Sequence, residues 1–274
     1  MNRDGQPASA SANAVRRPFW SRTAFRVPAL PEALMSPVRL LGQVIRSLGR
    51  RLPPAERISA QMHNVGNNSV VFISVTLGFL GLILVYQGCV QVLKVLPDLS
   101  GVGGAFIFAM VRTFGPTITG LMIATRVGAG IAAEIGSMTV TDQVEAMKVA
   151  NSDPVSYILA PRFLACVVMT PVLWVFGTLV GIVAGYLMGH WRFGIATPTF
   201  LNLHVTTIHD VVIGFLKAES YGIVIPVLAA EAGFKARGGS EGVGWATTSA
   251  VVNASFAVIV LDFVISTLAF LAGY

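Results

Sequence analysis

The sequence contains few charged residues, few cysteines and few histidines. Only 12% of its 274 residues are Asp, Glu, Lys or Arg, whereas a soluble domain usually carries about a quarter. The two cysteines, Cys89 and Cys166, fall in apolar stretches, where free thiols behave as small hydrophobic side chains. The four histidines mostly lie near the ends of such stretches, which favours interfacial or structural roles over metal binding.

Motifs for nucleotide binding and for hydrolysis are also missing. There is no Gly-x-x-x-x-Gly-Lys-Ser/Thr loop, which would hold the phosphates of ATP. There is also no His-Glu-x-x-His zinc motif. We therefore expect that the chain binds no cofactor and that any ATP used with it is bound by another polypeptide.

What the chain has in abundance is apolar sequence. Hydrophobic residues make up 54% of it, and its mean hydropathy is +0.71. A helix crosses a hydrocarbon core about 30 Å thick with about 20 apolar residues. Five stretches are long enough, which predicts an all-α integral membrane protein with about five transmembrane helices. The predicted spans are residues 70–93, 104–126, 158–189, 209–234 and 246–271.

Positive charge is concentrated before the first span. Ten of the nineteen Lys and Arg residues precede residue 70, which indicates a cytoplasmic N-terminal side. No zinc, helix-turn-helix or aromatic-basic signature accompanies them, so nucleic-acid binding is not expected. Residues 1–35 are rich in Ala, Ser, Pro and Arg without apolar periodicity, and this predicts a disordered basic segment. No secretory signal is visible, and an organellar transit peptide is the alternative for this segment.

Residues 36–68 are predicted to contain an amphipathic helix, ahead of a transmembrane domain over residues 69–274. From Pro37 to about Ser59, apolar residues recur at spacings of three and four and alternate with arginines. Such a pattern is typical of a basic helix that lies in the membrane interface. The alternative is a soluble helix that packs on a partner.

The predicted topology places residues 127–157 and 235–245 in the cytoplasm. The first of these loops is the longest, and its apolar residues alternate with polar ones. We interpret it as a short amphipathic helix parallel to the membrane, because a transporter driven by a separate motor needs a rigid element that docks on the motor. The residues predicted to couple the chain to an ATPase are Glu134, Met138, Thr141, Asp142, Gln143, Glu145 and Met147.

Several motifs in this order resemble the MlaE/YrbE-type permeases of phospholipid ABC transporters associated with mammalian-cell-entry (MCE) proteins. The resemblance covers about residues 40–272. One departure concerns the intramembrane Arg112, which a Glu usually follows in the family and which Thr113 follows here. The matching runs are Gly115-Pro116, the thirteen residues from Arg126 to Met138, Thr141-Asp142-Gln143, Asp153-Pro154, Pro161-Arg162, Glu241 to Thr248, and Leu261-Asp262-Phe263.

The resemblance implies a homodimer bound to two cytoplasmic ABC ATPase subunits and to a periplasmic ring of MCE-domain proteins. It implies phospholipid as the substrate, the bacterial inner membrane as the location, and a coupling helix within residues 134–147. An organellar envelope inner membrane is the alternative location. Glycines at four-residue intervals in the third span would allow close helix contact in a dimer or, equally, within one protomer. These are Gly177, Gly181, Gly185 and Gly189.

Charged residues within the predicted spans are candidates for the lipid site, because a charge in the hydrocarbon core needs a partner or a polar cavity. At 1.5 Å per residue, Arg112, Lys217 and Asp262 each lie about 12 to 14 Å from the outer ends of their spans. We therefore predict that these three residues form one substrate-binding cluster that holds a phosphate. An ion pair that only fixes helix packing is the alternative, and Glu219 and Glu231 are further charged residues of the spans.

The most direct interpretation is a permease subunit that has no enzymatic chemistry of its own. Two alternatives from other classes stay open. The first is a membrane-embedded lipid-modifying enzyme with Asp262 or Glu219 as its acid or base. The second is a membrane anchor for an outer assembly.

Overall fold

The computed structural model describes residues 30–50, 52–95 and 98–273, and residues 37–274 form one compact unit. Most of the predicted disordered segment 1–35 lies outside the described residues. Helix α2 (Leu30–Arg50) ends shortly before Pro53 and Pro54, and helices usually end at or before the residue that precedes a proline. The predicted amphipathic helix is thus shorter than expected at its C-terminal end. Its Val44 and Ser47 are buried on one side of the helix, while the apolar Val38 and Ile45 are exposed.

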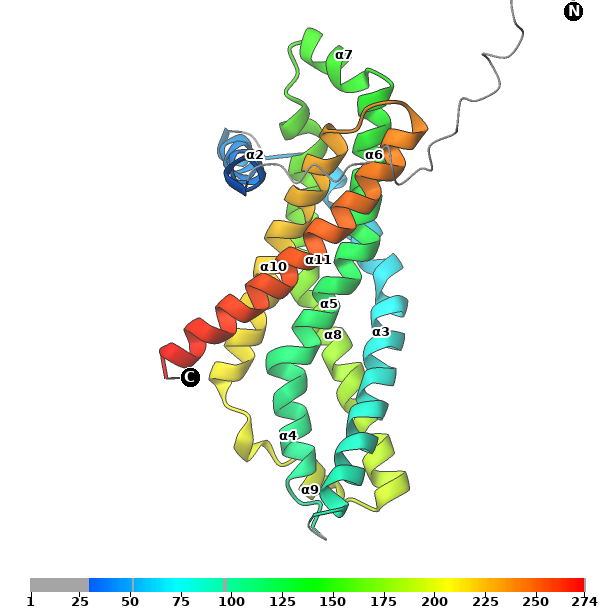
Figure 1. The fold of residues 1–274 in the computed structure, drawn as a ribbon, viewed down its shortest axis with the longest axis vertical. Coiled ribbons are helices and arrows are strands. Elements are labelled where there is room, and N and C mark those ends of the chain that lie inside the picture. The colour runs from blue at the N-terminus through cyan, green and yellow to red at the C-terminus, as the bar shows by residue number, and fades with distance from the viewer. Residues whose placement is uncertain (1–29, 51, 96–97, 274) are drawn as a thin grey trace, which may run out of the picture. The chain divides into compact units, whose positions relative to one another are not determined.

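Five helical segments in the described part of the chain are long and apolar enough to cross a membrane, as predicted. All of them extend beyond the apolar stretches, the first by fifteen residues, since Ala55 rather than residue 70 begins α3. Figure 1 shows these long helices, with α7 (Gln143–Val149) at one end and α9 (Thr197–Phe200) at the other. The five segments are Ala55–Leu93, Val102–Val140, Val155–Phe193, Ile208–Phe234 and Ser240–Leu271.

The second span is a composite helix with two π-helical turns. It consists of α4 (Val102–Ala109), a π-helical turn at Met110–Phe114, α5 (Gly115–Ile123), a second π-helical turn at Ala124–Gly128, and α6 (Ala129–Val140). Arg112 lies in the first turn and Arg126 in the second. Such turns recur at functional sites, because the wider helix redirects the side chains it carries.

Helix α3 packs along α8 (Ala160–Phe193), and the two helices run in the same direction. Their contact relies on glycine, since a Cβ atom at Gly81 would overlap the backbone carbonyl of Gly181. The rest of the glycine stripe faces the same protomer: Gly185 lies against Phe106, and Gly189 lies against Phe200. The stripe therefore mediates packing within one protomer, and of the two interpretations left open by the sequence the dimer contact is not supported.

Helix α10 (Ile208–Phe234) occupies the middle of the packing and contacts α5, α6, α8 and α11 (Ser240–Leu271). Its first turn carries a capping box, in which Thr207 and Asp210 satisfy each other's groups. Two glycines with positive φ, Gly238 and Gly239, allow the sharp reversal from α10 to α11. Helix α11 is the least enclosed span, with 11% of its most apolar window buried.

The buried side chains form two apolar clusters, one in each half of the bundle. The first contains Ile73, Phe106 and Tyr221 and lies toward the end that carries α9. The second contains Val44, Ile135 and Phe163 and lies toward the end that carries α7. Hydroxyls within the spans bond to carbonyls four residues back, as Ser74 does to Val70 at 2.6 Å, so that few polar groups face lipid unpaired.

Candidate functional site: two intramembrane ion pairs and an exposed cytoplasmic helix

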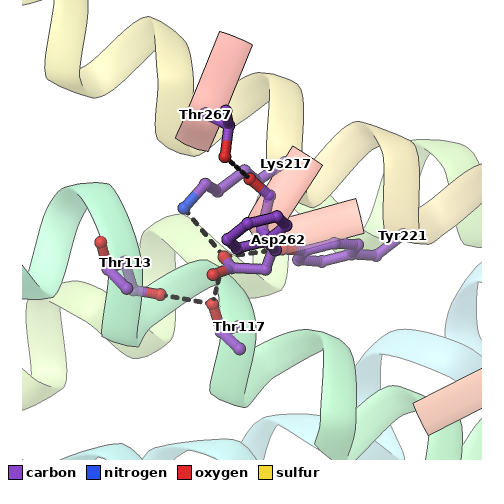
Figure 2. A network of polar contacts seen from close by, with 7 residues as sticks. Thr113, Thr117, Lys217, Tyr221, Asp262 and Thr267 are labelled. Carbon is purple, nitrogen blue, oxygen red and sulfur yellow. Dashed lines mark hydrogen bonds and ion pairs between the residues drawn. The ribbon is translucent and has the colours of Figure 1, made fainter. Parts of the chain in front are cut away.

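Lys217 of α10 and Asp262 of α11 form an ion pair within the membrane-spanning region. The Lys217 Nζ atom lies 2.8 Å from Asp262 Oδ1. The Lys217 side chain is completely buried, while 20% of the Asp262 side chain is exposed. Figure 2 shows the two side chains meeting between their helices. Because neither charge is stable alone in a low-dielectric interior, this pair ties α10 to α11.

Asp262 has two further polar neighbours on other elements. The Tyr221 hydroxyl donates to Asp262 Oδ1 at 3.1 Å, and it lies one turn beyond Lys217 on α10. Thr117 Oγ1 of α5 lies 2.7 Å from Asp262 Oδ1 and also 2.7 Å from the carbonyl oxygen of Thr113. Its single proton is shared between these two acceptors. Asp262 thus connects three helices through one carboxylate (Figure 2).

Arg112 makes the second intramembrane ion pair, and its partner is Asp210. Arg112 Nη1 lies 2.6 Å from Asp210 Oδ1, and the guanidinium also lies over the ring of Phe108, 5.5 Å from its centroid. Asp210 Oδ2 accepts from both the backbone N–H and the hydroxyl of Thr207, each at 2.8 Å. The Asp210 carboxylate of α10 therefore neutralises Arg112. In the resembled family a glutamate usually follows this arginine, and Thr113 occupies that position here.

The three residues predicted as one cluster are thus distributed over two neighbouring ion pairs. Lys217 and Asp262 are in contact, as the sequence analysis expects. Arg112 instead pairs with Asp210, which precedes Lys217 by seven residues, or about 10 Å along α10. The estimate from span ends was too coarse to separate these two levels. The role of the three residues in binding substrate stays a prediction.

The two ion pairs differ in which member is accessible. In the Arg112–Asp210 pair the cation is partly exposed, with 18% of the Arg112 side chain accessible against 4% for Asp210. In the Lys217–Asp262 pair the carboxylate of Asp262 is accessible and the ammonium is not. Arg112 is therefore the accessible cation of the two pairs, whereas the Lys217 ammonium is covered.

Two other charged residues of the predicted spans lie apart from this site. Glu219 is partly buried on the side of α10 that carries the exposed Phe215 and Leu216. Glu231 pairs with Lys235 at 2.5 Å near the C-terminal end of α10. In residues 30–50, 52–95 and 98–273, no group of three or more His, Cys, Asp or Glu side chains could hold a metal ion.

The predicted coupling segment does not form one short helix parallel to the membrane. Glu134 and Met138 belong to α6, which continues the second span, and the helix breaks only after Val140. Asp142 adopts a left-handed conformation with φ of 59° and begins α7. An Asp tolerates this conformation better than most residues. The expectation of one short amphipathic helix that carries both Met138 and Met147 was therefore wrong, because the apolar spacing continues across this turn. That a coupling helix lies within residues 134–147 stays a prediction.

The exposed side of α7 and the turn before it carry four of the seven predicted coupling residues. Asp142, Gln143 and Glu145 are exposed, and Glu145 pairs with Lys148 at 3.2 Å. Thr141, just before α7, is exposed as well and donates its hydroxyl to the carbonyl of Ser137 at 2.8 Å. Facing the protein are Met138, Met147 and the buried Val144, all of which pack in the apolar cluster nearest α7.

The sequence analysis missed three residues of these sites. Val149 at the end of α7 is 88% exposed and supplies apolar area beside the acidic residues. Asp210 was missed because it lies at the edge of a span. Its signal was the Thr207-x-x-Asp210 capping pattern. Thr117 gave no signal, because threonine is common in membrane helices that bond to their own carbonyls.

Two further features surround α7. Glu134 is 62% exposed and pairs with Arg162 of α8, whose side chain is only 10% exposed. A groove of about 710 Å³ lies between α7, the Leu40 and Gln43 side chains of α2, and the turn that joins α10 to α11. Arg237 of that turn lines the groove together with Asp142 and Glu145. This end of the molecule therefore offers both a protruding helix and a recess beside it.

The comparisons with known proteins agree with this architecture. A family model described as Permease MlaE matches residues 58–268. A probable ABC transporter permease of Rickettsia felis is 34% identical over 215 residues, which cover 78% of this chain and 83% of the relative. A probable ABC transporter permease of Synechocystis is 31% identical over 241 residues, 87% of this chain and 91% of the relative. The intermembrane phospholipid transport system permease protein MlaE of Haemophilus influenzae is 33% identical over 217 residues, with coverages of 78% and 82%.

Proposed function

The chain belongs to the MlaE permease family, and from this premise we propose that it is the membrane subunit of an ABC-type transporter that moves phospholipid with the help of a separate ATPase. The observation that carries the proposal is the extent of the family match, because residues 58–268 include α7 and nearly all of the five spans. The relative from Haemophilus influenzae is named for intermembrane phospholipid transport. ATP would be bound by the partner, since this sequence has no phosphate-binding loop.

Helix α7 is the proposed docking element for the ATPase. Its exposed surface presents Asp142, Gln143 and Glu145 together with the apolar Val149. A protein–protein contact typically has an apolar centre and a polar rim. Since α7 is joined to α6 by a turn of two residues and packs through Val144, a displacement of α7 would be passed to the second span and so to Arg112.

The two intramembrane ion pairs are the proposed contact for the lipid phosphate. Arg112 is the accessible cation, and a planar guanidinium can bind a phosphate with two parallel hydrogen bonds. Lys217 becomes available when Asp262 withdraws, which requires a displacement of α11. Because α11 is the span with the fewest buried residues, it meets the least resistance to such a movement. Opening the Lys217–Asp262 pair would thus expose a second cation as the lipid arrives.

We also propose the assembly implied by the family resemblance. It comprises two copies of this chain, two ATPase subunits and a periplasmic ring of MCE-domain proteins in a bacterial inner membrane. The exposed apolar side chains of α11, such as Phe256, Phe263 and Leu268, provide a surface for another copy or for lipid. The glycine stripe of α8 gives no support to the dimer, because it is covered within the protomer. The charge bias at the N-terminal side supports the cytoplasmic orientation of α7.

A purification followed by reconstitution would test the proposed function. The tagged full-length chain is extracted from its native membrane, and the proteins and lipids that accompany it are identified by mass spectrometry. We expect an ABC ATPase, an MCE-domain protein and a diacyl phospholipid. The reconstituted complex should then transfer a fluorescent phospholipid between vesicles only when ATP is hydrolysed. The proposal would be contradicted if no ATPase co-purified with the chain, or if phospholipid transfer were equally fast without ATP.

A further inference from the structure

A second cluster of cationic side chains lies near α7, away from the two intramembrane ion pairs. It lines a recess of about 190 Å³ between the first turns of α3, the end of α6 and the start of the third span. Arg57, Gln61, Tyr157 and Arg162 contribute polar groups, and Met138 and Ile158 contribute apolar surface. Arg162 precedes Trp174, which lies against Gly214 of α10, by twelve residues or about 18 Å of helix. The recess is therefore separate from Lys217 and Asp262.

Arg162 brings an unused hydrogen-bond donor to this recess. Its side chain is 90% buried, and its Nη2 atom pairs with Glu134. Its Nη1 atom is also buried and has no hydrogen-bond partner among the residues that the structure describes. A buried charged donor without an acceptor is unfavourable. An acceptor that enters the recess would satisfy this group.

Arg57 contributes a second guanidinium to the recess, and this guanidinium stacks on an aromatic ring. Its Cζ atom lies 4.2 Å from the centroid of the Tyr157 ring. This stacking leaves the N–H groups at the edge of the guanidinium free to bind an anion. Within the described part of the chain, Glu134 is the carboxylate paired to this couple of arginines. The recess therefore carries two positive charges against one negative charge.

The position and the lining of the recess indicate what kind of anion fits. Met138 packs in the same apolar cluster as Val44 of α2, Ile158 and Phe163. The sequence pattern places α2 in the membrane interface, so the recess lies at the level of the lipid headgroups. Tyr157 is 51% exposed, and tyrosines are enriched at this level. A ligand with a phosphate for the arginines and an apolar portion for Met138 and Ile158 matches this environment.

We propose that the recess formed by Arg57, Tyr157 and Arg162 binds the phosphate of a phospholipid from the cytoplasmic leaflet, at a site distinct from the Lys217–Asp262 pair. Arg162 Nη1 and the guanidinium of Arg57 each donate to the phosphate, and Gln61 is the neighbouring amide. The site does not depend on the proposed transport function, since a bound lipid here fixes α3, α6 and α8 to the membrane surface whether or not the chain transports lipid.

The test uses the full-length chain in phosphatidylcholine nanodiscs that contain a small share of phosphatidylglycerol with a photoactivatable group beside the glycerol. After illumination, the labelled peptides are identified by mass spectrometry. We expect label on the peptides that contain residues 57–61 and 157–162. Arg57→Gln should reduce the label there about five- to tenfold, the effect of losing one charge-assisted hydrogen bond. Arg57→Lys should retain more of the label than Arg57→Gln.

Arg46→Gln is the matched control, because Arg46 is an exposed arginine of α2 that does not line the recess. It should leave the labelling unchanged. Equal labelling of Arg57→Gln and the unmodified chain would overturn the proposal. An equal loss of label in Arg57→Gln and Arg46→Gln would also overturn it, because it would show that the lipid is attracted to the positive surface in general. Loss of the label with millimolar glycerol 3-phosphate would assign the site to a soluble phosphate. If Arg57→Gln left the labelling unchanged but no longer co-purified with an ATPase, the recess would be a contact for that protein and not for lipid.

Discussion

Lys217 and Asp262 form an ion pair whose ammonium is completely buried and whose carboxylate is partly accessible. Asp262 is also the acceptor for the hydroxyl of Tyr221 and a neighbour of the hydroxyl of Thr117. Removal of the carboxylate would leave the buried Lys217 ammonium without its counter-ion and the Tyr221 hydroxyl without its acceptor, while the Thr117 hydroxyl would keep the carbonyl of Thr113. The pair thus determines both how α10 holds α11 and whether Lys217 is available to a ligand.

The first prediction concerns the stability that this pair provides. Asp262→Ala should lower the free energy of unfolding by about 3 kcal/mol or more, because it leaves the Lys217 ammonium buried and unpaired. Asp262→Asn should be less damaging, since it keeps the shape and some hydrogen bonding. The double variant Lys217→Met with Asp262→Leu should recover much of the loss, because no unpaired charge remains. Thermal unfolding in detergent measures all three.

The same variants separate packing from lipid binding. If the Lys217 ammonium binds phosphate, the double variant should be stable but should retain less phospholipid through purification. If the pair only holds α10 and α11 together, lipid retention should recover along with stability. Equal thermal stability of Asp262→Ala and the unmodified chain would show that the pair is open in the folded protein.

The second prediction concerns Arg112 and Asp210. A double-mutant cycle with Arg112→Met and Asp210→Asn should give a coupling energy of about 1 to 3 kcal/mol, as contacting residues in one polar network do. The matched control is the exposed pair Glu145 and Lys148, whose coupling should be about 0.5 kcal/mol or less. A coupling energy as small as that of Glu145 and Lys148 would mean that Arg112 is bound mostly to another partner, such as a lipid.

The third prediction tests α7 as the docking helix. Reversing charge at Asp142 and Glu145 together, as Asp142→Lys with Glu145→Lys, should weaken co-purification of the ATPase or separate ATP hydrolysis from lipid transfer. Val149→Ser should act in the same direction, because it removes exposed apolar contact area. Asp98→Lys, an exposed change just beyond the opposite end of α3, should have no effect. An intact complex with lipid-stimulated hydrolysis in the α7 variants would rule out this docking surface.

The fourth prediction concerns the packing of α3 on α8. Gly81→Ala should destabilise the protomer by about 1 to 3 kcal/mol, because the new Cβ atom overlaps the carbonyl of Gly181 and forces the helices apart. Gly78→Ala is the matched control on the same helix. Its Cβ atom would lie 3.6 Å from Val180 Cγ1, an ordinary contact, so stability should hardly change. Similar melting temperatures for both variants would contradict the close contact.

The number and order of the spans could be predicted from sequence, because apolar length and the charge bias both follow from membrane thickness. The C-terminal ends of the first, fourth and fifth spans were also predicted correctly, at Leu93, Phe234 and Leu271, but every span begins earlier than predicted. Helix α3 continues for fifteen residues before Val70, since polar residues such as Asn64 and Asn67 are compatible with a helix that leaves the hydrocarbon. The break at Asp142 was also hidden, because a left-handed residue in a polar stretch has no distinct compositional signal.

The candidate site was only partly predictable for a related reason. Counting residues from span ends gives depth but not direction around the helix axis, so Lys217 and Asp262 could be matched while the partner of Arg112 could not. Asp210 pairs with Arg112 and caps α10 through Thr207 at the same time. The capping pattern predicts that Asp210 caps α10. The ion pair with Arg112 is seen only in the three-dimensional structure.

The two π-helical turns of the second span have a consequence for how such sequences change over time. Each turn behaves as one residue inserted into an α-helix, and removing one residue rotates everything beyond it by about 100°. The directions of Arg112 and Arg126 therefore depend on chain length within Met110–Phe114 and Ala124–Gly128. A one-residue deletion there would preserve every side chain of the site and still turn α6 and α7 away from their neighbours. In this span, the number of residues in each π-helical turn matters as much as their chemistry.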